Sequence, residues 1–245
     1  MKKLLITCFF VINHPVFASP SPVFGENGMV VSTSREASLV GIEILKKGGN
    51  AVDAACAIGF ALAVTSSSNG NIGGGGFMVA RMADGTTFTL DYREKAPLAS
   101  HRDMFLDSKG QVIDDMSLRT RASSGVPGSV DGLLKAWKDY GSGNLSFKQI
   151  IAPSIALAER GFNLSYYEAK RFNDNKDLFL KNNAASKIFI RKDRKPWKAG
   201  DRLIQKDLSK TLKRISLKGR DGFYRGKTAD LIVAEMNKGN GLITH

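Results

Sequence analysis

The sequence predicts an α+β fold, because segments with helical periodicity accompany one clear β-hairpin pattern in a chain rich in apolar residues. Apolar residues make up 42% of the 245 positions, enough to build a buried core. No internal repeat, low-complexity tract or clear linker divides the chain, so one domain over residues 19–245 is expected. This composition argues against general disorder.

Two helices are expected at the start of this domain. Thr33 and Glu36 form a capping-box pattern in front of apolar residues at helical spacing, and a pair of glycines ends this first helix. Asn50 is suited to cap a second helix over residues 51–64, where nearly every position is apolar except Asp53. A helix that is apolar on most sides must be covered on most sides, so we expect the second helix to be buried.

A glycine-rich segment follows the second helix. Four consecutive glycines, residues 73–76, run into a strand-like segment. They can adopt backbone angles that side chains forbid and allow another group to approach the main chain closely. Two interpretations stay open: the amides form an anion-binding concavity, or the segment is a tight packing turn. A phosphate loop is disfavoured, because no Gly-Lys-Ser/Thr follows and a strand comes next.

Two strands are expected after the glycines, over residues 77–82 and 86–92. They are joined through Ala83-Asp84-Gly85, which is a hairpin signal. Arg93 then stands where the second strand ends. Further on, helices are expected over residues 130–140, 147–160, about 208–217 and about 224–237, with basic loops filling the rest of the last third.

The positive charge lies in the last third of the chain. Residues 19–164 hold 14 Lys and Arg against 14 Asp and Glu, whereas residues 165–245 hold 20 against 9. The basic residues are interrupted by acids and lack the repeated aromatic platforms of a single-strand binder. A solvated surface is therefore favoured, and no nucleic-acid partner is expected.

Few residues offer independent catalytic chemistry. Beyond residues 1–18 the only histidines are His101 and His245, and no Gly-x-Ser-x-Gly elbow or His/Cys cluster accompanies them, so neither a serine triad nor a metal site is indicated. Cys56 lies among apolar residues and is interpreted as a small core residue, because burial suppresses thiol reactivity.

The first residues resemble a secretory signal. Lys2 and Lys3 precede an apolar run over residues 4–12, and small residues end at Ala18, where cleavage is expected. The alternative is a short membrane anchor, but the run falls well short of the roughly 20 residues that span a bilayer. We therefore expect residues 1–18 to be a signal peptide, no stable membrane anchor, and a periplasmic or secreted protein.

A series of short strings along the chain resembles the successive hallmarks of γ-glutamyltransferases. Each string alone is weak evidence, but their common order over most of the chain is specific. The strings are Gly48-Gly49-Asn50-Ala51-Val52-Asp53-Ala54-Ala55, Asn71-Ile72-Gly73-Gly74-Gly75-Gly76-Phe77-Met78, Asp91-Tyr92-Arg93-Glu94-Lys95-Ala96-Pro97, Asp103-Met104-Phe105-Leu106-Asp107, Ser124-Gly125-Val126-Pro127-Gly128, Ala152-Pro153-Ser154-Ile155-Ala156-Leu157-Ala158, Asp221-Gly222-Phe223-Tyr224-Arg225-Gly226 and Gly241-Leu242-Ile243-Thr244.

The resemblance implies an N-terminal-nucleophile hydrolase fold, an αββα sandwich of two stacked sheets between helix layers. It implies a precursor that cuts itself into a large and a small subunit, and a new N-terminal Thr that attacks the γ-glutamyl carbonyl of glutathione or another γ-glutamyl compound. Water or an amino acid then takes the acyl group. No cofactor is implied.

By motif position, Arg93 is the group that holds the α-carboxylate of the γ-glutamyl substrate. Its planar fork of donors matches a carboxylate, and a strand end beside a glycine turn is a rigid base. The alternative for Arg93 is a surface ion pair with a neighbour such as Glu94. No Thr of this chain occupies the nucleophile's motif position, so we expect residues 19–245 to be a truncated N-terminal part of the large subunit, an incomplete sandwich with exposed apolar surface and unpaired strand edges, inactive without the small subunit.

Two functions of other classes stay open beside this one. The first is a binding protein that uses Arg93 and the glycine turn to hold an amino acid without turning it over. The second is a non-enzymatic protein that binds an anionic surface through residues 165–245.

Overall fold

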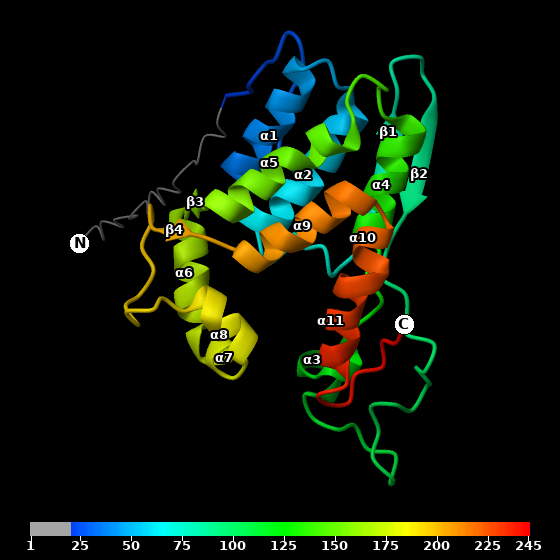
Figure 1. Cartoon of the computed structure of the whole chain (residues 1–245), viewed down its shortest axis with the longest axis vertical. Coiled ribbons are helices and arrows are strands. Elements are labelled where there is room, and N and C mark those ends of the chain that lie inside the picture. The colour runs from blue at the N-terminus through cyan, green and yellow to red at the C-terminus, as the bar shows by residue number, and fades with distance from the viewer. Residues whose placement is uncertain (1–20) are drawn as a thin grey trace, which may run out of the picture.

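The computed structural model describes residues 21–245 and consists mainly of helices, with a short hairpin at one side of them (Figure 1). The signal peptide expected over residues 1–18 lies outside the described residues and stays a prediction. Within the described part, no helix is long and apolar enough to cross a membrane.

The body of the molecule is a group of helices packed around α2. Helix α2 contacts α1, α4 and α5, and α5 contacts α9 in turn (Figure 1). Ten of its 15 residues are buried, which confirms the expected burial of this apolar helix. The bounds of these helices are α1 Arg35–Lys46, α2 Ala51–Thr65, α4 Ser129–Tyr140, α5 Phe147–Arg160 and α9 Lys206–Lys218.

The first two helix starts differ in how well the sequence predicted them. Asn50 caps α2 in a full capping box with Asp53, as expected. The cap of α1 is Ser34, whose hydroxyl accepts a hydrogen bond from the Ala37 amide at 3.4 Å, so the predicted role of Thr33 was wrong. Thr33 instead donates its hydroxyl to Ser66, across the loop that follows α2.

Strands β1 (Phe77–Arg81) and β2 (Thr87–Asp91) form the expected antiparallel hairpin, in which Phe77 pairs with Asp91. One face packs on the helices, and the ring of Phe88 stacks on Tyr140 with centroids 3.6 Å apart. The other face is open to solvent, with Phe77 63% and Val79 83% exposed. Among the described residues this sheet has only two strands, which confirms the exposed apolar surface and unpaired edges expected from the sequence.

A segment that we call the appendage, residues 165–201, leaves the body between two short paired strands. It was predicted as basic loops, but it contains three helices (Figure 1). Aromatic side chains of these helices pack together. A capping box of Ser165 and Glu168 starts the first of them and was a signal that the sequence analysis missed. The bounds are β3 Phe162–Asn163, α6 Tyr166–Asp174, α7 Lys176–Leu180, α8 Asn183–Phe189 and β4 Arg202–Leu203.

The C-terminal part contains one helix that was predicted and one that was not. The helix predicted over residues 224–237 is confirmed as α11 (Gly226–Met236), within two residues at each end, but the short helix α10 (Asp221–Tyr224) before it was not predicted. Arg225 between them is extended, and Gly226 has a φ of 56°, a left-handed angle that glycine adopts without strain. The remaining elements lie in the excursion between the hairpin and α4, and are α3 Met116–Arg119 and a 3₁₀ turn at Arg121–Ser123.

Candidate carboxylate-binding site

Arg93 lies two residues beyond β2, at the point where the sequence placed it. The strand ends here because the Asp91 carboxylate turns back and accepts a hydrogen bond from the Arg93 amide, with an N–O distance of 2.9 Å. This local turn competes with further strand pairing. The side chain of Arg93 is exposed, so its position depends on how firmly its backbone is held.

Three glycines hold the backbone of residues 92–95, and we call them the glycine clamp: Gly75, Gly125 and Gly128. A Cβ on Gly75 would lie 2.6 Å from both the Tyr92 carbonyl oxygen and the Glu94 amide nitrogen, and one on Gly128 would lie closer still to the same oxygen. A Cβ on Gly125 would lie 2.8 Å from the Cβ of Glu94. No side chain fits at these contacts, so the glycines allow the main chains to touch.

Hydrogen bonds complete the clamp. Lys95 and Val126 exchange two backbone bonds, of 3.2 Å from the Lys95 amide and 2.7 Å from the Val126 amide. The Gly128 amide donates to the Gly74 carbonyl at 2.8 Å. Three strings that are far apart in sequence, around residues 74, 94 and 127, therefore form one interlocked unit beneath Arg93.

The structure supports the packing-turn interpretation of the four glycines, residues 73–76. None of them has a positive φ, and close approach of other groups is the reason for glycine at Gly74, Gly75 and Gly76. The Gly76 amide is already used, because it donates to the Tyr92 carbonyl at 3.3 Å.

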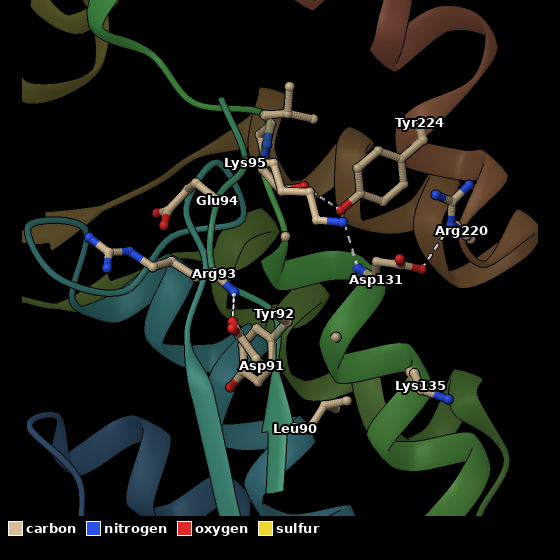
Figure 2. Close-up of a pocket in the computed structure, with 14 residues that line it drawn as sticks. Leu90, Asp91, Tyr92, Arg93, Glu94, Lys95, Asp131, Lys135, Arg220 and Tyr224 are labelled. Atoms are coloured by element: carbon tan, nitrogen blue, oxygen red, sulfur yellow. Dashed lines mark hydrogen bonds and ion pairs between the residues drawn. The ribbon is translucent and has the colours of Figure 1, made fainter. Parts of the chain in front are cut away.

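A cavity of about 590 Å³ opens beside the clamp. Its walls are the end of β2, the first turns of α4, and two residues from the C-terminal part, Arg220 and Tyr224. Figure 2 shows the guanidinium of Arg93 pointing to the side of the 92–95 segment opposite to Tyr224, Arg220 and Asp131. The guanidinium of Arg93 and the side chain of Tyr224 thus lie on opposite sides of the 92–95 segment.

The sequence analysis quoted the string that contains Tyr224 but assigned no role to it. The Tyr224 hydroxyl donates to the Pro127 carbonyl at 2.7 Å and accepts a hydrogen bond from the Asp131 amide at 3.3 Å. Arg220 pairs with the Asp131 carboxylate at 2.8 Å, and its guanidinium lies 4.8 Å from the centroid of the Tyr224 ring. Pro127 and Asp131 lie 97 and 93 positions from Tyr224 along the chain, so no local pattern indicates these contacts.

The alternative predicted for Arg93, an ion pair with Glu94, is not what the structure contains. Among residues 21–245, the guanidinium of Arg93 has no carboxylate within 4.0 Å. The Glu94 side chain lies instead over the glycine turn, where a Cβ on Gly74 would be 3.1 Å from its carboxylate oxygen. The donors of Arg93 therefore face solvent.

Other candidate groups do not join this site. Cys56 is fully buried in the core, and burial, with a smaller effect of Asp53, raises its thiol pKa to about 12, which confirms the core interpretation. Within residues 21–245, no three His, Cys, Asp or Glu side chains gather where they could hold a metal ion.

The fold is similar to that of solved γ-glutamyltranspeptidase structures. The crystal structure of Helicobacter pylori gamma-glutamyltranspeptidase matches with a TM-score of 0.88 and 43% identity, covering 91% of this chain and 64% of that chain. This likeness confirms the α+β, N-terminal-nucleophile hydrolase fold that the sequence resemblance implied.

The sequence comparisons give the family. The gamma-glutamyltranspeptidase family matches residues 37–245, and the chain belongs to this family. It is 48% identical over 244 residues to the glutathione hydrolase proenzyme of Pseudomonas sp. (strain A14), covering 99% of this chain and 42% of that protein. It is 43% identical over 223 residues to the glutathione hydrolase proenzyme of Escherichia coli (strain K12), covering 91% of this chain and 38% of that protein. The chain thus spans about two fifths of the length of these relatives.

Proposed function

We propose that residues 21–245 form the carboxylate-binding part of an enzyme that hydrolyses glutathione and transfers its γ-glutamyl group. In this proposal Arg93 holds the α-carboxylate of the γ-glutamyl donor. The nucleophile is a Thr outside this chain, because no Thr here stands at the family's motif position. Its hydroxyl attacks the γ-glutamyl carbonyl, the amine of the donor leaves, and water or an amino acid takes the acyl group.

The observation that carries the proposal is the state of Arg93. Its guanidinium is exposed and without a carboxylate partner among the described residues, while its backbone is fixed by the glycine clamp. A free planar fork of donors can bind a carboxylate through two parallel hydrogen bonds. A fixed base allows the guanidinium to set the distance between the bound substrate and a nucleophile, which governs the rate.

The proposal also explains why the backbone of this arginine is firmly held. The α-carboxylate and the γ-carbonyl of a glutamyl group are separated by three carbon atoms, so the group that binds one end positions the other. Loose binding of the α-carboxylate would misplace the reacting carbonyl. We therefore expect substitutions at Arg93 to affect substrate affinity strongly.

The test is a chimera in which residues 19–245 replace the matching segment of the Pseudomonas sp. (strain A14) proenzyme. The chimera should release glutamate from glutathione, and its Arg93→Lys variant should show a KM raised by about tenfold or more, because lysine keeps the charge but loses the two-pronged geometry. Arg102→Lys is the matched control: Arg102 is exposed and lies outside the clamp, so its KM should not change. An Arg93→Lys chimera with an unchanged KM would contradict the proposal.

The binding-protein alternative is tested with the chain itself. Calorimetry of the 245-residue chain with glutamate or glutathione should give no tight binding, because in our proposal one arginine supplies only part of the pocket. A tight, stoichiometric complex without glutamate release would favour the alternative function.

A further inference from the structure

The Tyr224 hydroxyl makes two hydrogen bonds, one as a donor and one as an acceptor. It donates to the carbonyl of Pro127, in the turn of the glycine clamp, and it accepts from the amide of Asp131, in the first turn of α4. The hydroxyl thereby joins the turn to the helix that follows it. Phenylalanine at this position would keep the ring and leave both backbone groups without this partner.

The ring of Tyr224 is itself held in place. Arg220 lies over the ring at 4.8 Å and bonds Asp131 through Nε at 2.8 Å, so the guanidinium connects the ring to the same helix start. Burial raises the pKa of Tyr224, so the hydroxyl keeps its proton and remains a donor at neutral pH.

The turn that Tyr224 holds is in direct contact with the backbone that carries Arg93. Val126 exchanges two hydrogen bonds with Lys95, and a Cβ on Gly128 would lie 2.9 Å from the carbonyl oxygen of Arg93. A displacement of the turn therefore moves the main chain on both sides of Arg93. Because the guanidinium stands at the end of a long side chain, a small tilt of the backbone becomes a larger shift at its donors.

We propose that Tyr224 is a positioning residue for Arg93, acting through the 125–128 turn without touching the substrate. The proposal rests on the function proposed for Arg93. Tyr224 lies on the opposite side of the 92–95 segment from the guanidinium, as Figure 2 shows, so its effect passes through the backbone. Its consequence is that the hydroxyl, far away in sequence, sets the affinity for the γ-glutamyl donor.

The first test measures the clamp directly, with hydrogen exchange on the 245-residue chain. Tyr224→Phe should accelerate exchange of the Lys95, Val126 and Gly128 amides by about tenfold, the scale of one or two lost hydrogen bonds. Amides in the middle of α5 should keep their rates. Arg220→Gln keeps the hydroxyl but removes the stacked guanidinium, and should accelerate the same amides by a smaller factor. Unchanged exchange at Lys95 and Val126 in both variants would overturn the proposal.

The control is Thr228→Val, in the same C-terminal part. The buried Thr228 hydroxyl donates to the Gly222 carbonyl and accepts from Arg214, so this change also removes two hydrogen bonds but none that reaches the turn. It should accelerate exchange in α10 and α11 and leave Lys95 and Val126 unchanged. Acceleration of the clamp amides by Thr228→Val as well would mean that Tyr224 has only a general stabilising role.

The second test uses a double-mutant cycle in the chimera. Tyr224→Phe alone should raise the KM for glutathione about tenfold, with a smaller change in kcat. If Tyr224 acts through Arg93, the same change in an Arg93→Lys background should raise the KM much less. Full additivity of the two effects would overturn the proposal. Failure of the proposed function is distinguishable, because it shows in the KM of Arg93→Lys alone, whereas the exchange rates do not depend on substrate.

Discussion

The 92–95 segment and the appendage each carry an arginine at the surface, but the surroundings of the two guanidinium groups differ. In the appendage, Arg191 bonds the Asp193 carboxylate at 2.9 Å, contacts Asp201 and lies 5.5 Å from the ring of Trp197. Arg93 has no such partner among the described residues, and only its backbone is fixed. A cation that is satisfied by its neighbours supports a fold, whereas one that is left free on a rigid base is suited to bind a ligand.

The rigidity of the 92–95 segment can be broken at Gly128. Its φ of −108° is open to any residue, so the obstacle to a side chain is steric: a Cβ would collide with the Tyr92 carbonyl oxygen. Gly128→Ala should reduce the free energy of unfolding by about 3 kcal/mol, as expected for overpacking against backbone. Urea unfolding measures this loss.

Gly73→Ala is the control for that experiment, because it lies in the same glycine segment and meets only the Asn71 side chain, at 3.6 Å. It should change the free energy of unfolding little. Equal effects of the two substitutions would show that the clamp does not depend on close backbone contact.

The independence of the appendage can be tested at Trp197. Its indole packs beside Phe172 and donates to the Phe189 carbonyl at 2.7 Å, and its backbone pairs with Asn173. Trp197→Ala should cost about 2 kcal/mol, less than for a fully buried aromatic residue. Hydrogen exchange should accelerate in α6 to α8 and stay unchanged at Lys95. Equal acceleration in both regions would show that they unfold as one cooperative unit.

The smallest expected effect concerns the paired arginine itself. Hydrogen bonding from Arg191 lowers the pKa of Asp193 to about 2. Arg191→Gln should return this pKa toward its ordinary 3.8, as measured by NMR titration of the carboxyl carbon, while Arg194→Gln should not. Because the folded pKa is depressed, the stabilisation from this pair is present above pH 3.8 and is lost as the pH falls through about 2. The Asp193 carboxylate is exposed and Arg191 is only half-buried, so solvent screens the pair and the urea midpoint should barely move.

The sequence predicted those features that depend on neighbouring residues. The hairpin, α2 and α5 carry local patterns of alternation, periodicity and capping, and the structure places them within a residue or two of expectation. The helices of the appendage were missed because their apolar faces are short and become a core only when three segments meet. Helix α10 was missed because it has only four residues, too few to show a helical period.

The candidate site divides in the same way. Arg93 was predicted from a strand end, a glycine turn and the family strings, and these are all short-range signals. The clamp and the role of Tyr224 depend on contacts such as that between Tyr224 and Pro127, which are 97 positions apart. One sequence does not show which distant residues meet, so the geometry that fixes Arg93 came only from the structure.

The open face of the hairpin has a practical consequence for handling the protein. The apolar side chains of Phe77 and Val79 are exposed on this face. The outer edges of β1 and β2 pair with no further strand in the described part of the chain. An exposed apolar hairpin with unpaired edges can pair with strands of other molecules, so concentrated samples will tend to aggregate. A charged residue in place of Val79, which points to water and supports no contact of the clamp, is the natural first change for a better-behaved sample.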